Sequence, residues 1–516
     1  MLRAQGAQST SWYSLLSPRN EHRPPIGGTK WCVVPAALIG TTQGQTWGAS
    51  ACALQAAIGR VMTVIGFESR ARLGSLLLAI SLALLVISSL ASRYSGGYGP
   101  RAANTDFWAY YFAAQTLGEN PQAHLYEYGE GRNPQVYRAL PLSEMGRHAA
   151  QAGIPEVRQF VYPPILADAL VPLSRVSPSR AAFIWRAFNL LCMFASTLMI
   201  ARAIRIRWLS FEFAGLTLAA ISFYPIHEAI YFGQIMIVLL ALWSLSVLAY
   251  QEGHIVLSAC ALAVATSLKV TPILIIPMFI LWKDRKWLFS YLTTGIGLFG
   301  IMAVVNGVEI LRAWGHVLTN MSGLEPSTSN KNIASVFAWI YYGRIFDTDS
   351  MIQVISAPSL MLSIASKAAS GIFFLGCLYP VWRNRLRISR AEKGTVIAVL
   401  ALAIITISPV SWRHAYAIAF LPLAMVWARA LRQRVPLWQG LVLAVTTVSL
   451  GTLFLDGASA LPLPPFAQIL LASIWVLSSV AFCLTTLWSR AWTCGPTSEP
   501  SPLERRRVEP GVLLQQ

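Results

Sequence analysis

Apolar segments recur along almost the whole chain and alternate with short polar segments. A helix needs about 20 apolar residues to cross the hydrocarbon layer of a bilayer, and shorter apolar segments are typical of buried or partly inserted helices. The pattern predicts about twelve spans. In chain order they are 73–91, 181–201, 211–225, 235–249, 255–268, 271–282, 288–305, 360–382, 394–407, 416–427, 437–455 and 469–488. The predicted fold class is an all-α integral membrane protein, a polytopic helical bundle.

One further apolar segment, 165–173, directly follows Pro163 and Pro164. Prolines suit the first turn of a helix, where a missing N–H leaves no hydrogen bond unmade. The segment is too short for a full span, so we expect it to enter the membrane only in part. If it crossed fully, every later span would reverse and Arg202–Arg207 would lie outside.

Basic residues gather in short clusters between the apolar segments. These clusters are Arg202-Arg205-Arg207, Lys283-Arg285-Lys286, Arg383-Arg385-Arg387-Arg390-Lys393, Arg429-Arg432-Arg434 and Arg505-Arg506-Arg507. Such clusters mark the cytoplasmic side of a bacterial-type membrane protein. With all of them inside, both termini are cytoplasmic and two large loops, about 92–160 and 306–356, are extracytoplasmic. The segments 255–268 and 271–282 form a hairpin with Lys269 at its outer tip. We expect the plasma (inner) membrane as the location.

The composition agrees with a membrane protein and narrows the function classes. Hydrophobic residues make up 55% of the 516 residues and charged residues 12%, with a mean hydropathy of +0.53. The net charge of +18 follows the loops between spans, so we do not expect a nucleic-acid partner. No phosphate-binding glycine loop, dinucleotide fingerprint or zinc spacing occurs, which argues against an ATP-driven pump. We predict no cofactor and no metal site, and make no prediction on metal dependence.

The two ends of the chain differ from its middle. Residues 1–61 are rich in Ser, Gln, Gly and Thr, and we interpret them as a disordered extension or an over-extended start. Residues 62–490 form the predicted membrane domain, and 491–516 form a basic cytoplasmic tail. The seven cysteines show no CxxC pair, so we expect neither a disulfide framework nor a metal site.

Several polar residues fall on the outer side in this topology. They are Asp106, Tyr162, His227, Glu228, Gln234, Lys269, Asn330, Lys331, Asn332, Trp412, Arg413 and His414. Ionisable groups at membrane depth are costly, so their presence indicates a functional site. The residues therefore predict a polar site that faces outward, but they do not separate an enzyme from a transporter.

Each of these residues also has a plainer interpretation. Thr105 or Asp106 could cap the helix that follows, and Asn330–Asn332 could cap another. Lys269 could extend its ammonium group to the membrane interface, and His227-Glu228 could be an ordinary solvated helix end. Trp412 and Tyr416 could be interfacial aromatic residues.

Six short segments occur in one order along residues 73–430. They are TDFWAYYFAA at 105–114, FVYPPIL at 160–166, FGQIMIVLLAL at 232–242, SLKVTPIL at 267–274, NKNIAS at 330–335 and SPVSWRHAY at 408–416. In this order they resemble glycosyltransferase family 87, the polyprenyl-phosphate-mannose-dependent α-mannosyltransferases of the GT-C superfamily. Two positions depart from the family. Ala415 stands where a second histidine is common, and Val270 stands where a proline often follows the lysine.

The resemblance implies a GT-C-type bundle and a hexosyltransferase that acts on the outer side of the membrane. It implies Asp106 as the catalytic base, and an inverting single displacement on a polyprenyl-phosphate hexose, with a glycan or glycolipid as acceptor and membrane lipids around it. For the donor phosphate our candidates are Lys269, Arg413 and His414. Our candidates for substrate binding are Tyr162, His227, Glu228, Gln234, Asn330, Lys331, Asn332 and Trp412.

A transporter or flippase of a lipid-linked sugar is the alternative, because it would share an outward polar cavity. Such a protein would more readily show repeated halves, and the sequence shows no such symmetry. A scaffold without chemistry is a third possibility, and it would not need Asp106.

Overall fold

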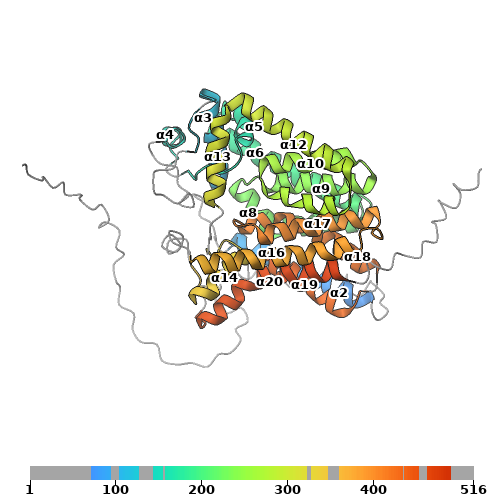
Figure 1. Cartoon of the computed structure of the whole chain (residues 1–516). Helices are drawn as coiled ribbons and strands as arrows, with labels where there is room; N and C mark the ends of the chain where they lie inside the picture. The colour runs from blue at the N-terminus through green and yellow to red at the C-terminus, as the bar shows by residue number, and fades with distance from the viewer. Residues whose placement is uncertain are drawn as a thin grey trace, which may run out of the picture. The chain divides into compact units, whose positions relative to one another are not determined.

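The computed structural model describes residues 71–94, 104–121, 123–126, 143–154, 157–321, 327–346, 359–433, 435–452 and 462–489. These residues form a helical bundle without strands, apart from two isolated bridges, Ser327 with Phe346 and Asn330 with Trp412 (Figure 1). The all-α membrane architecture is confirmed in this part of the chain. The predicted extension 1–61 and the predicted tail 491–516 lie outside the described residues.

Twenty helical elements make up the described bundle. They are α2 (Ala71–Tyr94), α3 (Thr105–Glu119), α4 (Glu144–Gln151), α5 (Pro164–Ser174), α6 (Pro178–Ala203), α7 (Phe211–Ser222), α8 (Tyr224–Phe232), α9 (Met236–Glu252), α10 (Ile255–Leu268), η2 (Thr271–Ile275), α11 (Ile276–Leu281), α12 (Arg285–Asn306), α13 (Val308–Met321), α14 (Ile333–Tyr342), α16 (Leu360–Arg383), α17 (Arg390–Ile407), η3 (Arg413–Ala419), α18 (Phe420–Arg432), α19 (Leu437–Gly451) and α20 (Pro465–Trp488).

Every apolar segment expected to span coincides with one of these elements or with a consecutive pair. By length and composition, five described helices could cross a membrane, or six with the bent pair α7 and α8. The predicted count of twelve spans is therefore not confirmed. The apolar segment 165–173 is α5, a helix of 11 residues that begins at Pro164 and contains Pro172.

Three predicted spans are interrupted in the structure. The segment 211–225 divides into α7 and α8, which meet at an angle of 57°. The segment 271–282 begins as the 3-10 helix η2, and 416–427 lies across η3 and α18. In the first two, a proline at the start of the second element, Pro225 of α8 or Pro277 of α11, fits a helical first turn but cannot donate to the preceding turn. Non-helical backbone lies at Lys269, between α10 and η2, and at 408–412, between α17 and η3.

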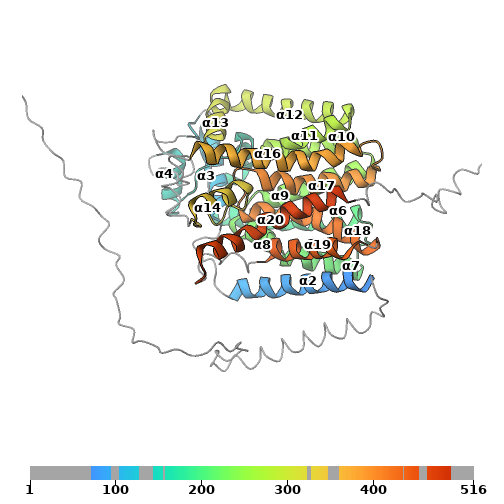
Figure 2. The same cartoon turned by 60° about the horizontal axis from the view of Figure 1, so that its bottom comes forward.

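The bundle has two distinct ends. At one end α3, α4, α13 and α14 gather beside the long helices (Figures 1 and 2). At the opposite end, where α9 finishes and α17 begins, lie Arg202, Lys393 and Arg429, which belong to three of the predicted basic clusters. There Arg202 Nε lies 2.5 Å from Glu252 Oε1, and the Lys393 ammonium group lies 4.9 Å from the centre of the Trp282 ring. The charged loops thus share one end, as the charge pattern predicted.

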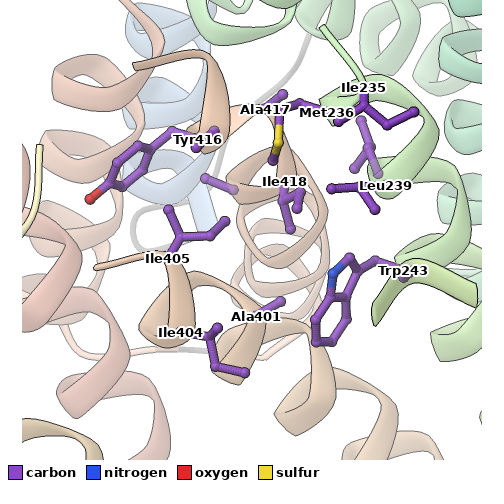
Figure 3. Packing of buried hydrophobic residues seen from close by; sticks show 14 of the residues in the cluster. Ile235, Met236, Leu239, Trp243, Ala401, Ile404, Ile405, Tyr416, Ala417 and Ile418 are labelled. Atoms are coloured by element: carbon purple, nitrogen blue, oxygen red, sulfur yellow. The ribbon is translucent and has the colours of Figure 1, made fainter. Parts of the chain in front are cut away.

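The predicted outer loops contain helices in their described parts. Loop 92–160 contributes α3 and α4, and loop 306–356 contributes α13 and α14. Within the bundle, α9, α17 and η3 interlock through buried apolar side chains such as Trp243, Ile404 and Ile418 (Figure 3). Many apolar side chains on α12 and α16 are instead exposed, for example Val304 and Ile372. An apolar exterior suits helices that face lipid.

Candidate active site

A cavity of about 470 Å³ lies where α3, α17, η2, η3 and the 158–163 segment meet. One part of its lining is polar and comprises Asp106, Tyr110, Arg158, Gln159, Tyr162, Gln234, Lys269, Trp412 and His414. The other part is apolar and includes Ile273, Leu274, Trp314, Leu318 and Phe374. Six of the twelve residues predicted from the sequence line this cavity: Asp106, Tyr162, Gln234, Lys269, Trp412 and His414.

Asp106 lies in the first turn of α3 but does not cap the helix. The cap position is Asn104, whose backbone is left-handed (φ 62°) and whose side chain makes no capping hydrogen bond. Asp106 Oδ1 accepts a hydrogen bond of 3.1 Å from Arg158 Nη1. Asp106 Oδ2 is buried and has no hydrogen-bond partner among the described residues. This carboxylate therefore has one oxygen in an ion pair with Arg158 and one buried oxygen whose hydrogen-bonding capacity is unused within the described residues.

Gly233 lets α3 pack closely against the turn between α8 and α9. Its φ is +70°, and a Cβ built there would lie 2.6 Å from Phe107 Cβ. The carbonyl oxygen of Gly233 accepts a 2.7 Å hydrogen bond from Trp185 Nε1. The backbone N–H of Asn104 donates to Tyr231 O at 3.0 Å. The glycine thus fixes the position of the helix that carries Asp106.

We expect Gly233→Ala to lower both stability and transfer activity. The left-handed backbone costs a side chain about 1 kcal/mol, and the contact with Phe107 adds about 1–3 kcal/mol of overpacking. Gly343→Ala is the matched control, because Gly343 has φ +64° but nothing within 4 Å of a built Cβ. Thermal unfolding in detergent should show a clearly larger loss for Gly233→Ala. Equal losses in the two variants would contradict the role given to the Phe107 contact.

Two tyrosines share one acceptor at the polar wall. Tyr110 Oη and Tyr162 Oη donate to Gln234 Oε1 at 2.8 and 3.0 Å. Burial, aided by the negative charge of Asp106, raises the pKa of Tyr162 to about 12. Burial, together with Tyr162 and Asp106, also raises the pKa of Tyr110 well above its usual value. Both phenols therefore remain neutral donors near pH 7, and Gln234 holds them in place.

Lys269 supplies a positive charge to the cavity from the turn between α10 and η2. Its ammonium group lies 3.5 Å from Met236 Sδ and 6.0 Å from the centre of the Tyr162 ring. Among the described residues no carboxylate lies within ion-pair distance of it. Burial lowers the pKa of Lys269 to about 8, although the charge of Asp106 acts in the opposite direction. The result is a poorly solvated cation without a fixed counter-ion.

Residues 408–412 form the wall opposite α3 and are held by the 330–332 segment. Asn330 Oδ1 accepts from the Ser411 N–H at 2.7 Å, and Asn332 Nδ2 donates to Ser408 O and Pro409 O at 2.7 Å each. Asn332 Oδ1 also accepts from Ser335 N–H at 2.7 Å and so caps α14. We call these contacts the asparagine clamp. They position the wall, and neither asparagine lines the cavity.

The remaining predicted site residues also lie off the cavity. Glu228 is buried on α8, and its Oε1 forms a 2.9 Å ion pair with Arg413 Nη2. The ammonium group of buried Lys331 lies 5.8 Å from the ring centres of both Trp339 and Trp475. His227 is half-buried on α8. The Glu228–Arg413 pair links α8 to η3 directly behind His414.

Tyr110, Arg158 and Gln159 are among the lining residues that were not predicted from the sequence. Arg158 is the most notable of them, because it pairs with Asp106 and its guanidinium carbon lies 5.0 Å above the Trp412 ring. A signal was present, since this arginine lies two positions before Phe160 of the FVYPP segment, in a loop that the charge pattern places outside. Among the described residues no three His, Cys, Asp or Glu side chains group so as to hold a metal ion.

Comparison with known proteins agrees with the resemblance seen in the sequence. Residues 160–409 match glycosyltransferase family 87. The chain is similar to the polyprenol-phosphate-mannose-dependent alpha-(1-2)-phosphatidylinositol mannoside mannosyltransferase of Mycolicibacterium smegmatis. The two are 26% identical over 332 residues, which is 56% of this chain and 67% of the relative. The family match contains Tyr162, Gln234 and Lys269, whereas Asp106 precedes it and Trp412 follows it.

Proposed function

We propose that this membrane hexosyltransferase, which matches glycosyltransferase family 87 over residues 160–409, transfers mannose from a polyprenyl phosphate to a hydroxyl group of a glycan or glycolipid. The transfer inverts the anomeric carbon and takes place on the extracytoplasmic side. The observation that carries this proposal is that one cavity is lined both by Asp106, whose Oδ2 makes no hydrogen bond among the described residues, and by Lys269, a cation without an ion-pair partner among them. The relative supports mannose as the sugar and a glycolipid as the acceptor through its name.

Asp106 acts as the general base of a single displacement. The acceptor hydroxyl donates its proton to Oδ2 as its oxygen bonds to the anomeric carbon. The bond from that carbon to the phosphate oxygen breaks on the opposite face, so the configuration inverts. Phosphate is a good leaving group and needs no general acid, which fits a polar wall in which Asp106 is the only carboxylate among the described residues.

Lys269 and His414 face the phosphate. A cation where negative charge develops lowers the barrier more in a water-poor cavity than it would in solvent. Arg413 acts differently, because Glu228 neutralises it behind the wall. We therefore place Arg413, Glu228 and the asparagine clamp among the groups that position Trp412 and His414. Tyr110, Tyr162 and Gln234 orient the sugar from the other side.

The apolar part of the cavity suits the lipid of the donor. Ile273 and Leu274 from η2, Trp314 and Leu318 from α13, and Phe374 from α16 provide a surface without charges. Apolar walls with a few polar groups at one end are typical of sites for amphiphilic ligands. The prenyl chain lies along this surface with the phosphate directed at Lys269.

The basic clusters support an extracytoplasmic site. They lie at the end of the bundle opposite the cavity, and basic clusters mark the cytoplasmic side. The protein is then a multi-pass plasma membrane enzyme with both termini in the cytoplasm. A transporter of lipid-linked sugars has no further support, because the family consists of glycosyltransferases.

A reconstituted transfer assay tests the proposal. The purified protein in proteoliposomes receives a radiolabelled polyprenyl-phosphate mannose and membrane glycolipid extract from its source. We expect the label to move to a glycolipid, and expect no transfer from a nucleotide-linked mannose. Polyprenyl-phosphate glucose is the matched control for the sugar. Transfer of glucose in place of mannose would correct the sugar, and use of the nucleotide donor would contradict the proposed donor class.

The pH dependence follows from the pKa of Lys269. Burial lowers this pKa to about 8, so the side chain is charged below that pH and loses its charge as pH rises through it. We expect kcat/KM for the donor to fall above about pH 8. Lys269→Arg should keep its activity to higher pH, since a guanidinium group does not deprotonate there. The same alkaline decline in both proteins would show that another group causes it.

A further inference from the structure

Arg158 joins the two sides of the cavity. Its Nη1 lies 3.1 Å from Asp106 Oδ1 on α3, and its guanidinium carbon lies 5.0 Å above the Trp412 ring on the opposite wall. The Asp106 side chain is only 6% exposed, whereas the Arg158 side chain is 38% exposed and lines the cavity. The arginine can therefore contact a ligand while it holds the carboxylate.

The net charge of the groups that line the cavity depends on whether Asp106 is ionised. The ionised carboxylate neutralises Arg158, which leaves Lys269 as the unpaired cation. A polyprenyl-phosphate sugar is a phosphodiester with one negative charge, and Lys269 matches it. During transfer the acceptor proton neutralises Asp106, while the leaving phosphate becomes a monoester with up to two negative charges. Total charge is conserved, but one negative charge has moved from Asp106 to the phosphate.

We propose that Arg158 is a positioning residue that holds Asp106 while the carboxylate is ionised, and becomes a second cation for the departing phosphate once Asp106 is protonated. This inference rests on the proposed function, because it needs a phosphate leaving group. Before the step, the contact to Oδ1 directs Oδ2 toward the acceptor. After the step, the neutral carboxyl group attracts the guanidinium less, and the attraction of the phosphate replaces it.

Four other titratable groups near Asp106, and Arg413 behind them, do not take the place of Arg158. Tyr110 on the same helix and Tyr162 before α5 face it as neutral phenols. Lys269 acts on it from the end of α10. His414 lies on the opposite wall, and Arg413 is paired with Glu228. Arg158 is thus the cation in direct contact with the carboxylate among the described residues.

Rescue by the conservative variant separates this role from simple packing. Arg158→Gln should lower kcat by about 10²-fold, because the amide carries no positive charge for the carboxylate or the phosphate. Arg158→Lys keeps the positive charge and should restore most of the rate. Arg147→Gln is the control, since Arg147 is exposed on α4 and pairs with Glu144 in the first turn. An Arg158→Lys protein as slow as Arg158→Gln would contradict the proposal.

Product binding gives a test that needs no turnover. Asp106→Asn mimics the protonated carboxyl group, so it should bind a short-chain prenyl phosphate about tenfold more tightly than the wild type does. The corresponding prenyl alcohol should show no such gain. The double variant Asp106→Asn/Arg158→Gln should lose the gain, and Asp106→Asn/Arg158→Lys should keep it. Titration calorimetry in detergent measures all four proteins.

The outcomes are distinguishable. Equal affinity of wild type and Asp106→Asn for the prenyl phosphate would overturn the role of Arg158 and leave the proposed donor class intact. A gain that survives Arg158→Gln would also overturn it, because another cation would then be responsible. If no variant bound the prenyl phosphate, the proposed function would fail and this inference would fail with it.

Discussion

Asp106→Asn is expected to reduce sugar transfer by about 10²–10⁴-fold, the usual contribution of a general base. The amide has nearly the same shape as the carboxylate, and its oxygen can still accept from Arg158, so the wall of the cavity should persist. What disappears is the ability of Oδ2 to take a proton. We therefore expect a fall in kcat with a smaller change in KM for the donor, measured with radiolabelled polyprenyl-phosphate mannose.

Glu119→Gln is the matched control for this substitution. Glu119 is a carboxylate on the same helix α3, exposed and hydrogen-bonded by Gln115 at 3.2 Å, and it does not line the cavity. Its replacement should leave transfer within about twofold of the wild type, as for most surface positions. Unchanged transfer by a folded, membrane-inserted Asp106→Asn protein would exclude Asp106 as the base.

Lys269→Gln is expected to lower kcat/KM for the donor by about 10²-fold, comparable to the loss of one preorganised group that stabilises developing charge. The amide keeps a polar end but cannot carry a charge. Lys269→Arg should retain a substantial part of the activity. The split between kcat and KM is informative, because the phosphate gains charge during the reaction. A cation that acts there should affect kcat as well as binding.

Lys286→Gln is the control for Lys269→Gln. It makes the same lysine-to-glutamine change at the other end of the bundle. Lys286 is exposed in the first turn of α12 and is not among the residues that line the cavity. Its replacement should not change transfer. Full activity in Lys269→Gln together with a loss in Lys269→Arg would contradict this role. The size of the side chain, and not its charge, would then matter, and another cation would have to bind the phosphate.

Local signals in the sequence located much of this site. The apolar segments placed helices where the structure has them, and the basic clusters placed Asp106, Lys269 and His414 on one side. These signals work because membrane insertion depends on hydrophobicity and charge that can be read segment by segment. The motif around Asp106 could be recognised for the same reason, since it is continuous in the chain.

Contacts between distant segments could not be predicted in this way. Arg158 meets Asp106 across 52 positions, and Tyr110 meets Gln234 across 124. Glu228 and Arg413 were correctly grouped on one side, but no local pattern shows that they neutralise each other. The helix-cap alternative for Asp106 also depended on a local geometry, the left-handed Asn104, that only the folded chain displays.

The asparagine clamp bears on how the enzyme is made. Asn330 and Asn332 reach backbone groups 76 to 81 positions further along the chain. During synthesis Asp106 and Lys269 therefore emerge and insert long before residues 408–414 can close the opposite wall. A chain interrupted before that point would carry Asp106 and Lys269 but would lack one wall of the cavity. If Asp106 is the base that we propose, the protein becomes active only after nearly the whole bundle has entered the membrane.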